Sequence, residues 1–168
     1  MKQKLPKHPR ILSIAPSTRG VGFAVVEGIG VLANWGVKSA TKDKNEACIR
    51  HVRNLVKEYG PDVIVLEDPR STKRGYRIRQ LATKIAKLAT NWKIPVMMFS
   101  RGEVIQAFLG KATGSRHDVA QDIAKQFPEE LGFILPPKRK HWLKANYHMD
   151  MFDAVALARM IPRSCRTR

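Results

Sequence analysis

The fold of this chain is decided by the stretch Arg10-Ile-Leu-Ser-Ile-Ala-Pro-Ser-Thr-Arg-Gly-Val-Gly-Phe-Ala-Val-Val26. Its first apolar run, Ile11 to Ile14, predicts a short buried strand that stops at Ala15-Pro16. A turn rich in Ser, Arg and Gly follows, and then a second apolar run, so the stretch is typical of a hairpin. Chemistry in α/β proteins gathers at the carboxyl ends of strands. Ala15 therefore stands where a functional side chain is expected, and it offers only a methyl group.

The composition is strongly basic. The 168 residues include 31 Lys and Arg against 14 Asp and Glu, a formal net charge of +17. Such an excess predicts attraction to a polyanion, and nucleic acid is the first candidate. No membrane partner is expected, because no amphipathic basic helix or lipidation motif supports one. A merely soluble basic protein is the remaining alternative. The length predicts a single domain over residues 1–168, with residues 1–9 and 162–168 flexible.

Cysteine usage and the N-terminus indicate where the protein resides. Cys48 and Cys165 form neither a CxxC cluster nor a disulfide framework, so we expect a reducing, cytoplasmic setting. There the protein would be associated with the nucleoid, or encoded by a virus or plasmid in its host cell. No apolar segment follows the basic start, so we expect no signal peptide, and no stretch approaches the length needed to cross a bilayer.

The pattern of elements predicts the fold class. Gly30–Lys38 suggests a third strand, and residues 44–59 change to helical spacing. The continuous apolar run Val63–Leu66 predicts a strand covered on both faces, as in a parallel sheet, and it ends at Glu67. The later predicted elements are a helix over 76–92, a strand over 94–99, helices over 101–109 and 117–127, a loop over 128–144, and a helix from His148 that Pro162 ends. Together they predict an α/β fold with a five-stranded mixed sheet, three strands antiparallel and two parallel, and helices on both faces.

The segment from Pro69 to Gly102 holds nine Lys or Arg residues and no Asp or Glu. Residues 70–75 are expected to form a basic loop that faces nucleic acid. The outer face of the helix over 76–92 is also basic, but any amphipathic helix has a charged outer face, so both interpretations of that face stay open. The candidate DNA-binding residues in this segment are Arg70, Lys73, Arg74, Tyr76 and Arg77.

Three acidic residues are candidates for chemistry. Asp150 and Asp153 are three apart and share a helix face, and Glu67 follows a buried strand. Each also has an ordinary explanation, because acids favour the first turn of a helix and polar residues begin loops. Hard oxygen ligands suit Mg²⁺ or Mn²⁺. Two such ions, about 4 Å apart, activate water and stabilise the leaving oxygen in phosphodiester hydrolysis. A basic surface around a small acidic pocket is typical of a nuclease.

Four motifs, in order along nearly the whole chain, resemble those of RuvC-type Holliday junction resolvases in the RNase H-like (retroviral integrase) superfamily. They are Ile-Leu-Ser-Ile-Ala-Pro-Ser-Thr-Arg-Gly-Val-Gly-Phe-Ala, where the family has an Ile-Asp-Pro-Gly/Ser turn; Val-Ile-Val-Leu-Glu67; Gly110-Lys111-Ala-Thr-Gly-Ser-Arg116-His-Asp-Val119; and Met149-Asp150-Met-Phe-Asp153-Ala-Val-Ala-Leu157. The resemblance implies an RNase H-like fold. It also implies a homodimeric endonuclease that resolves four-way DNA junctions by Mg²⁺-dependent hydrolysis.

The resemblance assigns roles to individual residues. It implies that Glu67, Asp150 and Asp153 are catalytic and hold two Mg²⁺ (or Mn²⁺) ions in each active site. It implies further that Lys111 and Arg116 contact DNA. The family often has an aromatic wedge shortly after its catalytic Glu, but this sequence has Arg70 in that region. Tyr76 either replaces the stacking role of the wedge or packs against the helix it begins.

Ala15 is the main departure, because it occupies the position of the family's first catalytic Asp. Its methyl group predicts an inactivated chain that binds DNA without cutting it. An engineered replacement that traps bound DNA and a natural loss both fit the sequence. The rival hypothesis is a non-catalytic module that binds branched DNA and keeps the RNase H-like fold. A fragment of an actin-like sugar kinase or ATPase also opens with such a strand turn, but this chain is too short for its two domains.

Overall fold

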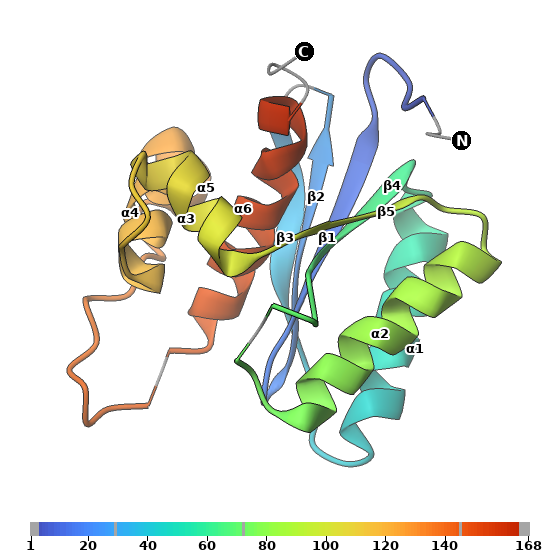
Figure 1. The fold of residues 1–168 in the computed structure, drawn as a ribbon, viewed down its shortest axis with the longest axis horizontal. Helices are drawn as coiled ribbons and strands as arrows, with labels where there is room; N and C mark the ends of the chain where they lie inside the picture. The colour runs from blue at the N-terminus through green and yellow to red at the C-terminus, as the bar shows by residue number, and fades with distance from the viewer. Residues whose placement is uncertain (1–3, 29, 72, 145, 165–168) are drawn as a thin grey trace.

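The computed structural model describes residues 4–28, 30–71, 73–144 and 146–164. Figure 1 shows a central sheet with a layer of helices on each face. The predicted flexibility of residues 1–3 and 165–168 lies outside the described residues, as does Cys165. In the part of the chain that is described, no helix is both long enough and apolar enough to span a membrane.

The sheet has five strands in the order β3-β2-β1-β4-β5. The strands are β1 (Arg10–Pro16), β2 (Gly20–Glu27), β3 (Val31–Ser39), β4 (Val63–Glu67) and β5 (Val96–Phe99). β2 pairs antiparallel with both β1 and β3, whereas β4 pairs parallel with both β1 and β5. The predicted mixed sheet is therefore confirmed, with three strands antiparallel and two added in parallel.

Strand alternation divides the core into two layers. Leu12 and Ile14 of β1 pack beneath α1 (Lys44–Tyr59) and α2 (Tyr76–Asn91). Ile11 and Ala15 point to the opposite face, with Ser13 between them on that side because its hydroxyl reaches α6. That face is covered by α3 (Arg101–Leu109), α4 (Arg116–Gln126), α5 (Pro128–Leu131) and α6 (His148–Ser164) (Figure 1). Side chains of a strand point alternately to its two faces, so one strand supplies both layers.

Two predictions about prolines were wrong. Residues 128–131, predicted as loop, form the single helical turn α5, whose first residue is Pro128. Proline suits that position because its fixed φ is already helical and its missing N–H has no partner there. Pro162 does not end α6, which continues to Ser164. Proline removes one helical hydrogen bond, but the residues after it still carry N–H donors and can add a final turn.

The first turns of α6 are fixed directly above the β1–β2 hairpin. A Cβ at Gly22 would lie 2.1 Å from the backbone oxygen of Asp150, so only glycine lets the helix approach this closely. Further along, the Ser13 hydroxyl donates a hydrogen bond of 2.5 Å to the backbone oxygen of Ala154. These contacts place the acidic start of α6 above the carboxyl end of β1.

Candidate functional site

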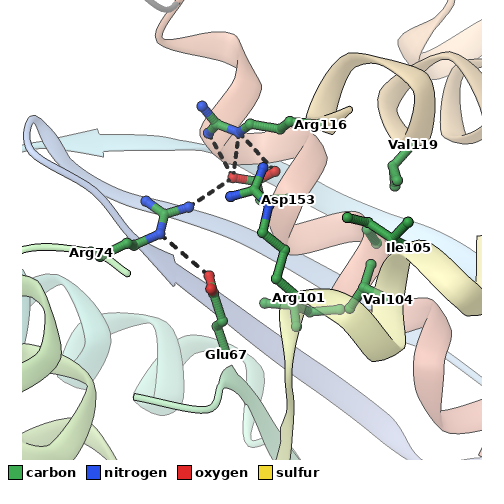
Figure 2. A pocket seen from close by; sticks show the side chains of 10 residues that line it. Glu67, Arg74, Arg101, Val104, Ile105, Arg116, Val119 and Asp153 are labelled. Carbon is green, nitrogen blue, oxygen red and sulfur yellow. Dashed lines mark hydrogen bonds and ion pairs between the residues drawn. The ribbon is translucent and has the colours of Figure 1, made fainter. Parts of the chain in front are cut away.

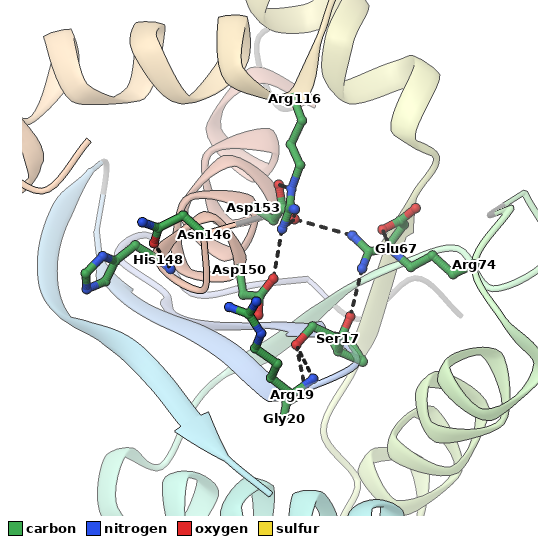
Figure 3. A network of polar contacts seen from close by, with 11 residues as sticks. Ser17, Arg19, Gly20, Glu67, Arg74, Arg116, Asn146, His148, Asp150 and Asp153 are labelled. Carbon is green, nitrogen blue, oxygen red and sulfur yellow. Dashed lines mark hydrogen bonds and ion pairs between the residues drawn. The ribbon is translucent and has the colours of Figure 1, made fainter. Parts of the chain in front are cut away.

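The three predicted acidic residues converge at one edge of the sheet. Glu67 is the last residue of β4, and Asp150 and Asp153 lie in the first two turns of α6. Figure 3 shows their side chains facing one another across the carboxyl ends of β1 and β4. Glu67 and Asp153 also line a small cavity of about 40 Å³, together with Arg74, Arg101, Val104, Ile105, Arg116, Val119, Ala156 and Leu157 (Figure 2). The sequence thus located a real cluster of carboxylates.

Two arginines, both predicted to contact DNA, bind these carboxylates. Arg116 begins α4, and its Nη2 lies 2.8 Å from Asp150 Oδ1 and 2.6 Å from Asp153 Oδ2, while its Nε donates to Asp153 Oδ2 at 2.8 Å. Arg74, in the basic loop, reaches Asp153 Oδ2 at 3.3 Å and Glu67 Oε2 at 3.4 Å. We call these five residues, Glu67, Arg74, Arg116, Asp150 and Asp153, the charge cluster.

The charge cluster is largely shielded from water. The exposed side-chain fractions of Arg116 and Asp153 are 22% and 21%. Burial disfavours the charged form of Arg116, but the charges and hydrogen bonds of Asp153 and Asp150 outweigh this effect, so the pKa of its guanidinium is raised above the ordinary value. Arg116 therefore remains a permanent cation inside the cluster.

The arrangement does not fit the pair of divalent ions that the resemblance implies. Both carboxylate oxygens of Asp153 already accept hydrogen bonds from Arg116, and Arg74 adds a second cation beside them. A metal ion needs those oxygens as ligands and would be repelled by both guanidiniums. Among the described residues, no group of three His, Cys, Asp or Glu side chains is arranged to hold a metal. The guanidiniums supply the positive charge that metal ions would otherwise bring.

Ala15 lies beside the charge cluster. It pairs with Gly22 across the hairpin, directly beneath the first turn of α6, and it is only 5% exposed. Its methyl group packs with the apolar residues of the α6 face. A carboxylate at this position would point into the same region as Asp150. As the chain stands, the position contributes packing and no ligand.

The other predicted DNA-binding residues lie outside the charge cluster. Arg70 folds back onto Asp68, with two contacts of 3.1 and 3.0 Å, and these hydrogen bonds lower the pKa of the Asp68 carboxyl. Lys73 and Lys111 are exposed. Tyr76 is 69% exposed at the start of α2 and does not pack as a core residue. These four side chains therefore stay predicted DNA contacts that are not part of the charge cluster.

Arg77 has a more structural position. It donates to the backbone oxygen of Ser17 at 2.9 Å and to Asn45 Oδ1 at 3.0 Å, so it joins α2 to the β1–β2 turn and to α1. Lys84 and Lys87, further along α2, line a broad groove against α1 together with Arg50 and Arg53. The outer face of α2 is therefore a basic surface that continues away from the charge cluster.

The sequence did not predict the role of Arg74 and Arg116 as partners of the acids. They lie 79 and 37 positions from Asp153 along the chain, and no local pattern indicates which cation meets which carboxylate. The sequence also assigned no role to the loop after α5, where Trp142 is exposed. A usable signal was present there, since a tryptophan stands among Lys138, Arg139 and Lys140.

Comparison with known proteins identifies the fold. No family model matches this sequence. The chain is 27% identical, over 121 residues, to the crossover junction endodeoxyribonuclease RuvC of Alkalilimnicola ehrlichii, which corresponds to 66% of this chain and 73% of that protein. The structure of T. thermophilus RuvC in complex with a Holliday junction substrate matches it with a TM-score of 0.68, covering 95% of this chain and 96% of that one at 19% identity. The chain has the RuvC fold.

A second structure of Thermus thermophilus RuvC gives the same result, with a TM-score of 0.65 at 20% identity over 94% of this chain and 96% of that one. The resemblance to RuvC-type resolvases, and with it the RNase H-like architecture, is therefore confirmed. The likeness extends over almost the full length of the described chain, so the strand ends that carry Ala15 and Glu67, and the helix that carries the two aspartates, occupy a RuvC-like framework.

Proposed function

We propose that this chain binds four-way or other branched DNA and does not cut it. The RuvC fold supports the substrate class, because a T. thermophilus protein of that fold is known in complex with a Holliday junction. The net charge of +17 supports DNA as the partner. The observation that carries the absence of cutting is the charge cluster, in which arginines hold the carboxylates, and Ala15 adds no acid where the resemblance expects one.

Binding is assigned to the cations that surround the charge cluster. Lys73 and Lys111 are exposed and free to approach phosphates, and Tyr76 is 69% exposed at the start of α2. Arg74 and Arg116 also pair with the acids of the charge cluster, so they position the basic loop and α4 against α6, and their contact with DNA stays a prediction. Phosphate contacts of this kind give affinity and set the orientation of the DNA, whereas the branch itself supplies the selectivity.

Hydrolysis of a phosphodiester needs a deprotonated water on one side of the phosphorus and charge stabilisation on the other. In this chain Arg116 engages both carboxylate oxygens of Asp153 and Oδ1 of Asp150, so these atoms are not free to act as bases or ligands. Ala15 provides no acceptor at the position where the family has an acid. The second candidate function is Mg²⁺-dependent junction cleavage, and the convergence of Glu67, Asp150 and Asp153 favours it.

We propose further that two copies act together in the cytoplasm, on a single junction, because a four-way junction with two-fold symmetry is matched by a two-fold protein. A homodimer would present two charge clusters and two basic loops to the DNA. Sedimentation of the protein alone and with one equivalent of junction tests this part: a monomer in both states would contradict it.

Cleavage and binding assays separate the two candidate functions. The parent chain should bind a synthetic four-way junction more tightly than a duplex of equal length, equally well in EDTA and in Mg²⁺, and should leave both uncut. The triple variant Ala15→Asp, Arg74→Gln, Arg116→Gln restores one acid and removes both guanidiniums, and it is the form in which metal-dependent nicking is expected. Nicking by the parent chain in Mg²⁺ or Mn²⁺ would contradict the proposal, and equal affinity for junction and duplex would remove its selectivity.

A further inference from the structure

The loop between α5 and α6, residues 132–147, carries a tryptophan on its surface. Trp142 is 67% exposed and belongs to neither hydrophobic core cluster. The other two tryptophans, Trp35 and Trp92, pack against the two cores. Tryptophan is usually largely buried because it has so much apolar surface, so one that is two-thirds exposed points to a binding role.

Both ends of this loop are anchored. Pro136 is buried, and its backbone oxygen lies 2.8 Å from a ring nitrogen of His117 on α4. At the other end, Asn146 accepts from the backbone N–H of His148 at 3.0 Å and from that of Met149 at 3.1 Å. The tip between these anchors extends past the start of α6 (Figure 1). The tip is therefore close to the start of the helix that carries Asp150 and Asp153.

The tip holds Trp142 in a defined turn. The backbone N–H of Leu143 donates to the oxygen of Lys140 at 3.0 Å, which makes Trp142 the third residue of a hydrogen-bonded turn. Arg139 closes the same turn by donating to the oxygen of Leu143 at 2.8 Å. Such a turn presents the indole in a limited range of directions, which lowers the entropy lost when a ligand binds.

The surroundings of the ring are cationic. Lys140 Nζ lies 5.4 Å from the centre of the Trp142 ring, and His141 meets it edge-on at 4.8 Å. Lys138, Arg139 and Lys144 add three more positive charges, and the sequence has no Asp or Glu from residue 132 to residue 149. Exposed aromatics among cations are typical of surfaces that bind unpaired nucleic acid, where the cations hold phosphates and the rings stack on bases.

We propose that Trp142 stacks on a base of bound DNA whose face is left unstacked at the branch point. A base within a duplex has both faces covered by its neighbours, whereas a branch interrupts stacking and exposes a face to an aromatic ring. This assignment rests on the proposed function, because branched DNA supplies such a base.

Fluorescence and affinity measurements on the full chain test this assignment. The probes are a four-way junction, a duplex and a single strand, each with one 2-aminopurine, and each titrated at several salt concentrations. The variants are Trp142→Ala, Trp142→Phe and, as the matched control, Trp35→Phe. We expect Trp142→Ala to weaken junction binding by about 5- to 150-fold, the usual range for one stacked base, with little change for duplex. Trp142→Phe should recover part of this loss.

The salt dependence separates stacking from charge. The slope of log affinity against log salt concentration reflects the number of cations that contact phosphates. Trp142 carries no charge, so Trp142→Ala should leave this slope unchanged. Arg139→Gln with Lys140→Gln removes two cations and should make the slope shallower by about 2. Junction binding should quench tryptophan emission in the parent and in Trp35→Phe but much less in Trp142→Phe. Equal losses for junction and duplex, or binding by Trp142→Ala within twofold of the parent, would overturn the assignment.

Failure of the proposed function gives a different result. If the parent binds junction and duplex equally, the selectivity for branched DNA is lost, but the single-stranded probe still measures stacking by Trp142. If the parent prefers the junction and Trp142→Ala is unchanged on all three probes, only the stacking assignment fails.

Discussion

Replacing Asp153 by asparagine tests whether the charge cluster stabilises the folded protein. Asparagine keeps the size of the side chain but removes the negative charge that Arg116 and Arg74 share. Removing one partner of a buried ion pair costs about 3–5 kcal/mol, because the other charge stays buried. Here the groups are about one-fifth exposed, and Asp150 still pairs with Arg116, so we expect a loss of about 2 kcal/mol.

Urea unfolding measures this loss in the free energy of unfolding directly. In thermal unfolding, a change of about 2 kcal/mol corresponds to a fall in Tm of about 4–8 °C for a chain of this length. The matched control is Asp68→Asn, which breaks a pair with Arg70, whose side chain is 85% exposed. Exposed pairs contribute at most about 1 kcal/mol, so the control should change far less. A loss below about 0.5 kcal/mol for Asp153→Asn would refute the reasoning. So would a free energy of unfolding of the parent that rises with Mg²⁺ concentration, because that would show that the folded chain binds the ion.

Three further predictions concern packing, the outer face of α2 and pH. Gly22→Ala should destabilise the chain by about 3 kcal/mol in urea unfolding, because the new Cβ would lie 2.1 Å from a backbone oxygen of α6; an unchanged midpoint would show that the helix can shift freely. Lys84→Gln with Lys87→Gln should reduce the salt slope of junction binding by about 2 if this face contacts DNA, and an unchanged slope would mean that it is merely solvated. Hydrogen bonds from Ser115 at the start of α4 lower the pKa of the Asp118 carboxyl. The carboxylate therefore contributes stability above its unfolded pKa, and this contribution is lost as pH falls through the folded pKa. Asp118→Asn should flatten the plot of unfolding free energy against pH in that acid range, and a plot parallel to that of the parent would contradict this.

The sequence predicted the fold well because the strands carry strong local signals. The continuous run Val63–Leu66 indicated a strand buried on both faces, and the structure pairs it in parallel beside β1. The convergence of Glu67 with Asp150 followed from the rule that chemistry gathers at the carboxyl ends of strands. The partners of these acids could not be predicted, since Arg74 and Arg116 look from sequence like any other cation in a chain with 31 Lys and Arg. Which charges meet is decided by tertiary packing of α4 and the basic loop against α6.

The charge cluster gives the alanine at position 15 a physical context. Three carboxylates brought together without a cation would repel one another and push α6 away from β4. Arg116 and Arg74 remove that repulsion, since each bridges two of the acids at distances from 2.6 to 3.4 Å. The edge of the sheet is therefore held together by these ion pairs, which also hold the basic loop that carries Arg74 to α6. If this edge binds DNA as proposed, the ion pairs keep it in place with alanine at position 15, and the affinity of the chain for junctions should not depend on divalent ions. That independence would distinguish this chain from a resolvase that merely lacks one metal ligand, because such a resolvase would need ions to draw its remaining carboxylates together.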